Sequence, residues 1–304
     1  MDSLLSATAC EHKELCYDHP YTATLHVEFD WQQAPDATPS LMEVYFFPQS
    51  GGQPQRFAFH HTGGEVDLLP GTYDALCLNT GGSANRYRGT DTWSTFEVYT
   101  RDASLLEGMD VLVTAEPPRP SGTEGQSGGL EPDSLWTACR EELTVDVSAG
   151  KQTLVFTPRQ VHTNFTFRIT GAANLTHVKA ISGSLSGLSR GYFVGTETYN
   201  EETVCVPFAA RHDNSSEVTG SFRGFCPDRT ASGLPHKFVI YILLDDGSSW
   251  YYTYDVTDQV NHAPDPRNIH LELDGLPLPA PVTDEGGMNA GVDGWDNVEV
   301  DLPM

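Results

Sequence analysis

Basic residues are scarce in this chain, with 17 Lys and Arg against 42 Asp and Glu and a formal net charge of −25 at pH 7. A surface of this sign repels phosphate backbones and anionic lipid headgroups. The charge therefore argues against nucleic-acid binding and against electrostatic attachment to a membrane.

Long apolar runs are missing as well. Beyond residue 10, no stretch approaches the roughly 20 apolar residues that a membrane-spanning helix needs. Any attachment to a membrane is therefore expected to be covalent. No long segment sustains helical periodicity, so a helical architecture is not expected.

Motifs that carry catalysis are also missing. The sequence has no H-E-x-x-H motif, no phosphate-cradling loop and no nucleophile with an obvious base nearby. Neither an enzyme nor a cofactor is predicted. Residues that can bind zinc cluster at Cys10, His12, Cys16 and His19, and carboxylates that can bind calcium cluster in the acidic segment 284–301. The favoured interpretation of both clusters is a solvated polar segment that holds no metal.

The six cysteines stand far apart, at positions 10, 16, 77, 139, 205 and 226. They form no C-x-x-C pair of the kind that indicates a redox centre or a zinc knuckle. In an exported protein the favoured disulfide joins Cys205 and Cys226, because both flank one predicted hairpin.

Apolar and polar residues alternate over much of the chain. Leu25, Val27, Phe29 and Trp31 share one face, which is the pattern of a half-buried strand. The sequence therefore predicts an all-β protein built from antiparallel β-sandwiches. Similar runs, separated by turns, recur at 42–47, 73–78, 93–99, 163–169, 204–208, 218–222, 238–244, 250–256 and 269–273.

Residues 116–133 break this alternation. They are rich in Pro, Gly and Ser and are expected to form a mobile linker. A chain of 304 residues suits two domains. The predicted division is a signal remnant and tether (1–20), a first sandwich (21–116), a linker (117–133), a second sandwich (134–276) and an extension with a short strand (277–304).

Aromatic residues crowd the predicted strand at 250–256. Trp250, Tyr252 and Tyr254 share one face and could stack on sugar rings. Strand cores also favour buried aromatic side chains, so core packing is the favoured interpretation.

The C-terminal extension ends in an alternating run. Burying an apolar side chain is worth roughly 1.5–3 kcal/mol, so this run is expected to dock. It could close an edge of its own sandwich, which is favoured, or be donated as a strand to a neighbouring subunit. The docking residues would be Trp295, Val298, Val300 and Leu302.

Cys10 ends a run of small and apolar residues and is followed at once by charged ones. This order is similar to the end of a bacterial lipoprotein signal, where cleavage leaves a lipid-modified cysteine as the new N-terminus. The run departs from the usual signal in carrying Ala7 where Leu is common and in having no Lys or Arg before Cys10. The alternative is an ordinary thiol near a frayed end.

Several segments carry a family resemblance through their order and spacing. They are C-E-H-K-E-L-C-Y (10–17), F-D-W (29–31), V-Y-F-F-P (44–48), L-P-G-T-Y (69–73), I-S-G-S-L-S-G (181–187), L-D-D-G (244–247) and Y-D-V-T-D-Q-V (254–260). Together they resemble the fimbrillin-like and minor-fimbria anchor lipoproteins of Bacteroidales, especially a group of two-domain lipoproteins.

The resemblance implies two tandem transthyretin-like β-sandwiches, lipid-anchored at Cys10 in the outer membrane and lying beside other fimbrial or surface subunits. Stalk subunits of such fimbriae resemble proteins that an arginine-specific protease matures near the N-terminus. Here the first arginine is Arg56, so an unprocessed anchor or accessory subunit is expected. The alternative is a surface lipoprotein that binds a glycan or a protein and joins no polymer.

Overall fold

The computed structural model describes residues 21–109, 116–227, 233–280 and 294–300. Within them the protein is all-β with mostly antiparallel sheets, which confirms the predicted fold class at this level. No helix in these ranges is both long and apolar enough to span a membrane. The helical elements are short: α1 (Thr257–Asn261), η1 (Trp31–Gln33), η2 (Trp93–Thr95), η3 (Val147–Ala149) and η4 (Leu175–His177).

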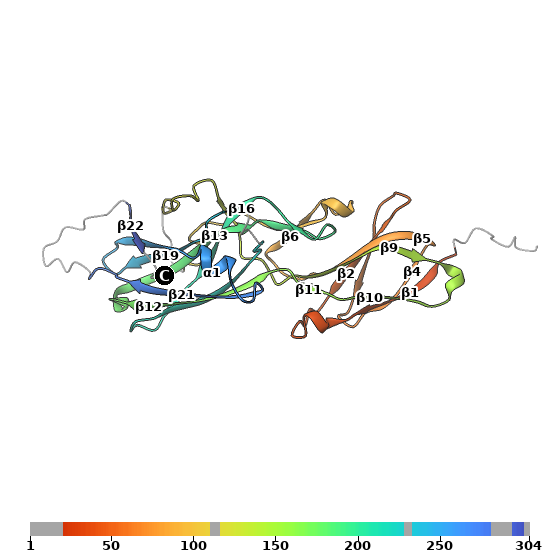
Figure 1. The fold of residues 1–304 in the computed structure, drawn as a ribbon, viewed down its shortest axis with the longest axis horizontal. Helices are drawn as coiled ribbons and strands as arrows, with labels where there is room; N and C mark the ends of the chain where they lie inside the picture. The colour runs from red at the N-terminus through yellow and green to blue at the C-terminus, as the bar shows by residue number, and fades with distance from the viewer. Residues whose placement is uncertain (1–20, 110–115, 228–232, 281–293, 301–304) are drawn as a thin grey trace, which may run out of the picture.

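The first lobe lies at the right of Figure 1 and contains two sheets. Leu25, Val27 and Phe29 point into the core between these sheets, as their alternation predicts. One sheet has the order β10-β1-β4, with β10 (Gln152–Phe156), β1 (Ala23–Phe29) and β4 (Gly64–Leu68). The other has the order β11-β9-β5-β2-β3, with β11 (Arg159–Gln160), β9 (Trp136–Val145), β5 (Gly71–Asn79), β2 (Met42–Pro48) and β3 (Gln55–Phe59).

The second lobe, at the left of Figure 1, also encloses a core between two sheets. Its four-stranded sheet has the order β17-β18-β12-β21, with β17 (Arg211–His212), β18 (Val218–Gly224), β12 (Thr163–Ala172) and β21 (Asn268–Leu276). Its six-stranded sheet has the order β22-β20-β19-β13-β16-β8, with β22 (Trp295–Val300), β20 (Ser249–Asp255), β19 (Lys237–Leu244), β13 (Val178–Ser189), β16 (Thr203–Ala209) and β8 (Ser127–Gly128).

A middle sheet connects the two lobes. Strand β7, from the first half of the chain, pairs antiparallel with β14, from the second half. The order of the middle sheet is β15-β14-β7-β6, with β15 (Thr198–Tyr199), β14 (Gly191–Phe193), β7 (Glu97–Thr100) and β6 (Asn85–Arg88).

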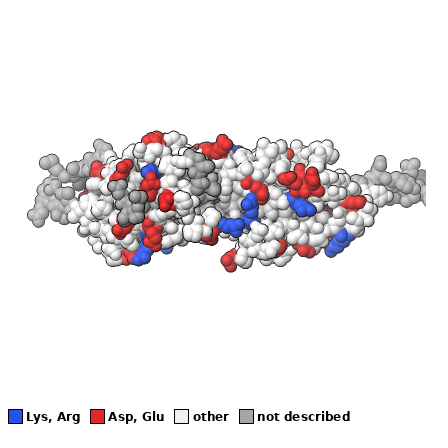
Figure 2. All heavy atoms as spheres, in the orientation of Figure 1, with Lys and Arg blue, Asp and Glu red and all other residues white. Residues whose placement is uncertain are grey.

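Acidic side chains are spread over both lobes on the face shown in Figure 2.

An apolar cluster, the joint core, also connects the lobes. It unites Leu76 and Leu78 of β5 with Tyr192 of β14 and with Phe225, which follows β18. Cys77, between the two leucines, belongs instead to the core of the first lobe. Strand β5 is therefore buried on both faces, because successive side chains of a strand point to opposite sides.

Residues 134–156, which the predicted division placed in the second sandwich, pair with strands of the first lobe. Strand β9 pairs antiparallel with β5, and Cys139 stands opposite Leu76. Strand β10 pairs in parallel with β1, and Val155 stands opposite Glu28. Local alternation identifies a strand but not its partner, which is why composition alone did not locate this pairing.

Residues 116–133, called the strap below, lie against the second lobe rather than forming the expected mobile linker. Strand β8 within the strap pairs in parallel with β16. The side chain of Gln126 accepts a hydrogen bond from the backbone N–H of Gly187 at 2.8 Å. The hydroxyl of Ser127 accepts another from the guanidinium of Arg190.

Glycine in the strap also permits a close approach to the segment that follows β7. A Cβ atom on Gly128 would lie 2.1 Å from the carbonyl oxygen of Ala103, so no larger residue fits there without a backbone shift. Arg190 is 6% exposed and also pairs with Asp102 at 3.0 Å and Glu202 at 2.6 Å. A segment with too few apolar residues to form its own core is thus held by hydrogen bonds from Gly187 and from the buried guanidinium of Arg190.

Candidate functional site

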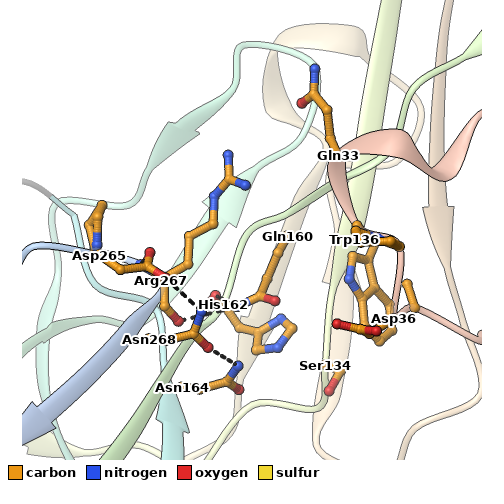
Figure 3. Close-up of a pocket in the computed structure, with 14 residues that line it drawn as sticks. Gln33, Asp36, Ser134, Trp136, Gln160, His162, Asn164, Asp265, Arg267 and Asn268 are labelled. Atoms are coloured by element: carbon orange, nitrogen blue, oxygen red, sulfur yellow. Dashed lines mark hydrogen bonds between the residues drawn. The ribbon is translucent and has the colours of Figure 1, made fainter.

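A groove of about 620 Å³ opens where the two lobes meet. Its first-lobe wall follows η1 and includes Asp36, and Trp136 at the start of β9 lines the same side. The opposite wall comes from the second lobe, through the start of β12 and the turn at 265–268 before β21. Figure 3 shows these side chains on either side of one hollow.

Trp136 and His162 form the aromatic part of the groove. Their ring centroids lie 5.6 Å apart with the planes 88° to each other, an edge-to-face contact. The Nδ1 atom of His162 lies 3.0 Å from the backbone nitrogen of Leu135 and accepts its hydrogen. Burial lowers the pKa of His162 to about 4, so the imidazole is neutral near pH 7.

Carboxamides form the polar part of the groove. The Asn164 side chain donates to Oδ1 of Asn268 at 2.9 Å. Nε2 of Gln160 donates to the backbone carbonyl of His162 at 2.9 Å and to that of Arg267 at 3.3 Å. The second of the Gln160 bonds joins β11 of the first lobe to the turn before β21 of the second lobe, so this side of the groove has a defined shape before any ligand arrives.

Asp265 stabilises the turn at 265–268, which forms part of the second-lobe wall of the groove. One carboxylate oxygen accepts from the backbone N–H of Arg267 at 2.9 Å, and the other accepts from the Asn268 side chain at 2.8 Å. These hydrogen bonds lower the pKa of Asp265, because they favour the ionised form.

The predicted disulfide between Cys205 and Cys226 does not form in the structure. Cys205 is a buried thiol in a side cluster with Tyr241, whereas Cys226 packs at the edge of the second-lobe core. The reason is that the expected hairpin is absent: β16 belongs to the six-stranded sheet and β18 to the four-stranded sheet.

The aromatic face at 250–254 is core rather than a ligand platform. Tyr252 and Tyr254 are both 0% exposed, and Trp250 packs against the same core. The two hydroxyls donate to the backbone carbonyls of Pro277 at 3.0 Å and Gly275 at 2.7 Å. Burial of the rings is thus compensated by hydrogen bonds at their polar ends.

The C-terminal run forms strand β22, which pairs in parallel with β20 of the same chain. Val298 and Val300 pack against the second-lobe core. Trp295 points to the other face, where its ring lies 5.9 Å from that of Tyr241. Leu302 lies outside the described residues, as does Cys10.

The described residues offer little for catalysis or metal binding. A G-x-S-x-G spacing occurs at 125–129, but Ser127 lies in β8 with its hydroxyl on Arg190. No described imidazole is hydrogen-bonded to Ser127, and a nucleophilic serine needs such a base. No group of three or more His, Cys, Asp or Glu in the described ranges is arranged to hold a metal ion.

Comparisons with known proteins cover most of the chain. A curated relative from Bacteroides ovatus, "Putative fimbrium anchoring subunit Fim4B", is 24% identical over 340 residues, which cover 99% of this chain and 96% of the relative. A solved structure of "a putative adhesin" from Bacteroides ovatus has a TM-score of 0.65 at 22% identity, covering 98% of this chain and 99% of that one.

A second solved structure, "the fimbrial anchor protein Mfa2" from Porphyromonas gingivalis, has a TM-score of 0.54 at 11% identity and covers 84% of this chain and 91% of that one. The family model described as "Domain of unknown function (DUF5119)" matches residues 9–209, about two thirds of the chain. The predicted resemblance is therefore confirmed: the chain belongs to the DUF5119 family and is similar over nearly its whole length to a fimbrium anchoring subunit and an adhesin of Bacteroides ovatus.

Proposed function

We propose that this protein is an anchoring subunit of a fimbria-like assembly at the cell surface. The observation that carries the proposal is the likeness to the Fim4B relative over 99% of the chain. The joint core supports it, because a subunit that holds a polymer on a cell must transmit load between its two ends without separating its lobes. Its partners would be the other fimbrial subunits.

The proposed attachment to the outer membrane is through lipid on Cys10. The described part of the chain begins at Tyr21, shortly before β1 at the outer end of the first lobe. Lipid at Cys10 would therefore place the first lobe next to the membrane and the second lobe away from it. The two lobes would correspond to the two transthyretin-like sandwiches, divided near residue 157 rather than within the strap.

We propose that the C-terminal strand β22 completes the sheet of the chain's own second lobe and is not donated to a neighbouring subunit. Pairing of β22 with β20 covers the edge of the six-stranded sheet that an incoming strand would otherwise need. An anchor occupies the end of a polymer and need not donate a strand. Self-docking of β22 is consistent with that position.

Replacing Cys10 with Ala in the full precursor is expected to move the protein from the membrane fraction to the soluble fraction. The reason is that each buried methylene of a lipid chain contributes about 0.8 kcal/mol, and the acidic surface supplies no other attachment. Fractionation followed by immunoblotting measures the shift, and fimbriae should detach with the protein.

The matched control is Cys16→Ala, which removes a nearby thiol and leaves Cys10 intact. Retention of the Cys10→Ala protein in the membrane fraction would refute the lipid anchor. Release of the protein while fimbriae stay on the cell would refute the anchoring role.

A further inference from the structure

We propose that the groove between the lobes binds a neutral oligosaccharide. This activity goes beyond anchoring, because the groove lies where the lobes meet and includes neither β22 nor the residues before Tyr21. Its volume of about 620 Å³ falls within the roughly 300–1,000 Å³ that is usual for ligand sites.

Trp136 supplies the apolar surface for a sugar ring. The indole is only partly buried and lines the hollow, while the edge-to-face contact with His162 holds its orientation. A pyranose presents a face of C–H groups that matches a flat aromatic ring, and a fixed ring loses little entropy when it is covered. No hydrogen bond of the Trp136 side chain within the described residues would be lost on binding.

Groups that match sugar hydroxyls surround this ring. The side-chain carbonyl oxygens of Gln160 and Asn164 have no hydrogen-bond partner in the described chain, because both amides use only their N–H groups. The carboxylate of Asp36 is a further acceptor on the opposite wall, and the guanidinium of Arg267 is a donor. Figure 3 shows Asp36 beside Trp136, with Gln160 and Asn164 across the hollow.

Charge selects neutral sugars over acidic ones. The groove holds two carboxylates, on Asp36 and Asp265, against the single guanidinium of Arg267. His162 adds no positive charge, because its pKa is lowered to about 4 by burial. An anionic sugar would therefore be repelled by the carboxylates of the groove and by the net charge of −25 on the whole chain.

The test is titration of the purified protein with neutral trisaccharides (cellotriose, laminaritriose, mannotriose and chitotriose) and with trigalacturonate as the acidic probe. Calorimetry and tryptophan fluorescence give the dissociation constant. At least one neutral probe is expected to bind with a Kd below about 1 mM, and trigalacturonate is expected not to bind. The affinity should not change between pH 5.5 and 7.5, because His162 stays neutral across that range.

Two variants locate the binding. Trp136→Ala should weaken the affinity at least about tenfold, and Asp36→Ala, an exposed change that breaks no described hydrogen bond or ion pair, by about threefold or more. Tyr21→Ala is the control, since that ring is 82% exposed and precedes β1, far from the groove.

Unchanged binding in both groove variants would overturn the proposal, as would the absence of binding by every neutral probe or a preference for trigalacturonate. Asp36→Ala keeps the test decisive if Trp136→Ala fails to fold. These outcomes are independent of fimbrial anchoring, which the Cys10→Ala experiment measures separately.

Discussion

Replacing Phe225 with Ala is expected to lower the free energy of unfolding by about 3–5 kcal/mol, the usual cost of removing a buried aromatic side chain. Phe225 is 1% exposed. It follows β18 of the second lobe, yet it belongs to the joint core together with Leu76 and Leu78 of the first lobe. The cavity would therefore weaken both lobes. Denaturant unfolding measures the loss.

Hydrogen exchange shows where the loss occurs. In the Phe225→Ala protein, exchange should accelerate in β5 of the first lobe as well as in β18. The matched control is Phe165→Ala, a change of equal size at a fully buried site in the core of the second lobe alone. It should leave β5 protected. Equal behaviour of the two variants in β5 would contradict a joint that couples the lobes.

A chain that ends at Leu278 is expected to be less stable as a monomer by about 3 kcal/mol. It lacks β22, so the partly buried side chains of Trp295, Val298 and Val300 no longer cover the second lobe. Full burial of such a side chain is worth roughly 1.5–3 kcal/mol, and partial burial of three gives a loss of this order. Thermal unfolding of the monomer measures it.

A chain that ends at Val300 is the matched control, because it keeps β22 complete. It should unfold at a higher temperature than the chain that ends at Leu278. An unchanged melting temperature after truncation at Leu278, combined with loss of association with a partner subunit, would show that β22 is donated to a neighbour. Self-docking would then be wrong.

Local sequence pattern was sufficient to identify several strands, although β1 ends at Phe29 and Trp31, predicted on the same strand face, lies in η1. Leu25, Val27 and Phe29 alternate into the core because a strand with one buried face has a period of two. The burial of Tyr252 and Tyr254 also followed from the strand preference of aromatic residues. Both predictions depend only on neighbouring residues.

Predictions that required a partner across the chain were less successful. The hairpin expected between Cys205 and Cys226 does not form, because the two flanking strands pair in different sheets. The strap was expected to be mobile because its own side chains are small. In the structure Gln126 accepts a hydrogen bond from Gly187 of β13, and Ser127 accepts one from Arg190, just after β13. Such contacts leave no local signal.

The groove gave no signal in the sequence for the same reason. Its residues come from four separate segments, near Asp36, Trp136, Asn164 and Arg267, and only the fold brings them together. Trp136 alone has no feature that distinguishes it from a core residue. The family resemblance indicated the anchoring role but not this site.

The most direct test of the anchoring role is affinity purification of the tagged protein from native outer membranes. The account predicts that a polymer-forming fimbrial subunit is recovered with it, and that the Cys10→Ala protein recovers the same subunit from the soluble fraction. Recovery of the protein alone from membranes that carry fimbriae would contradict the account.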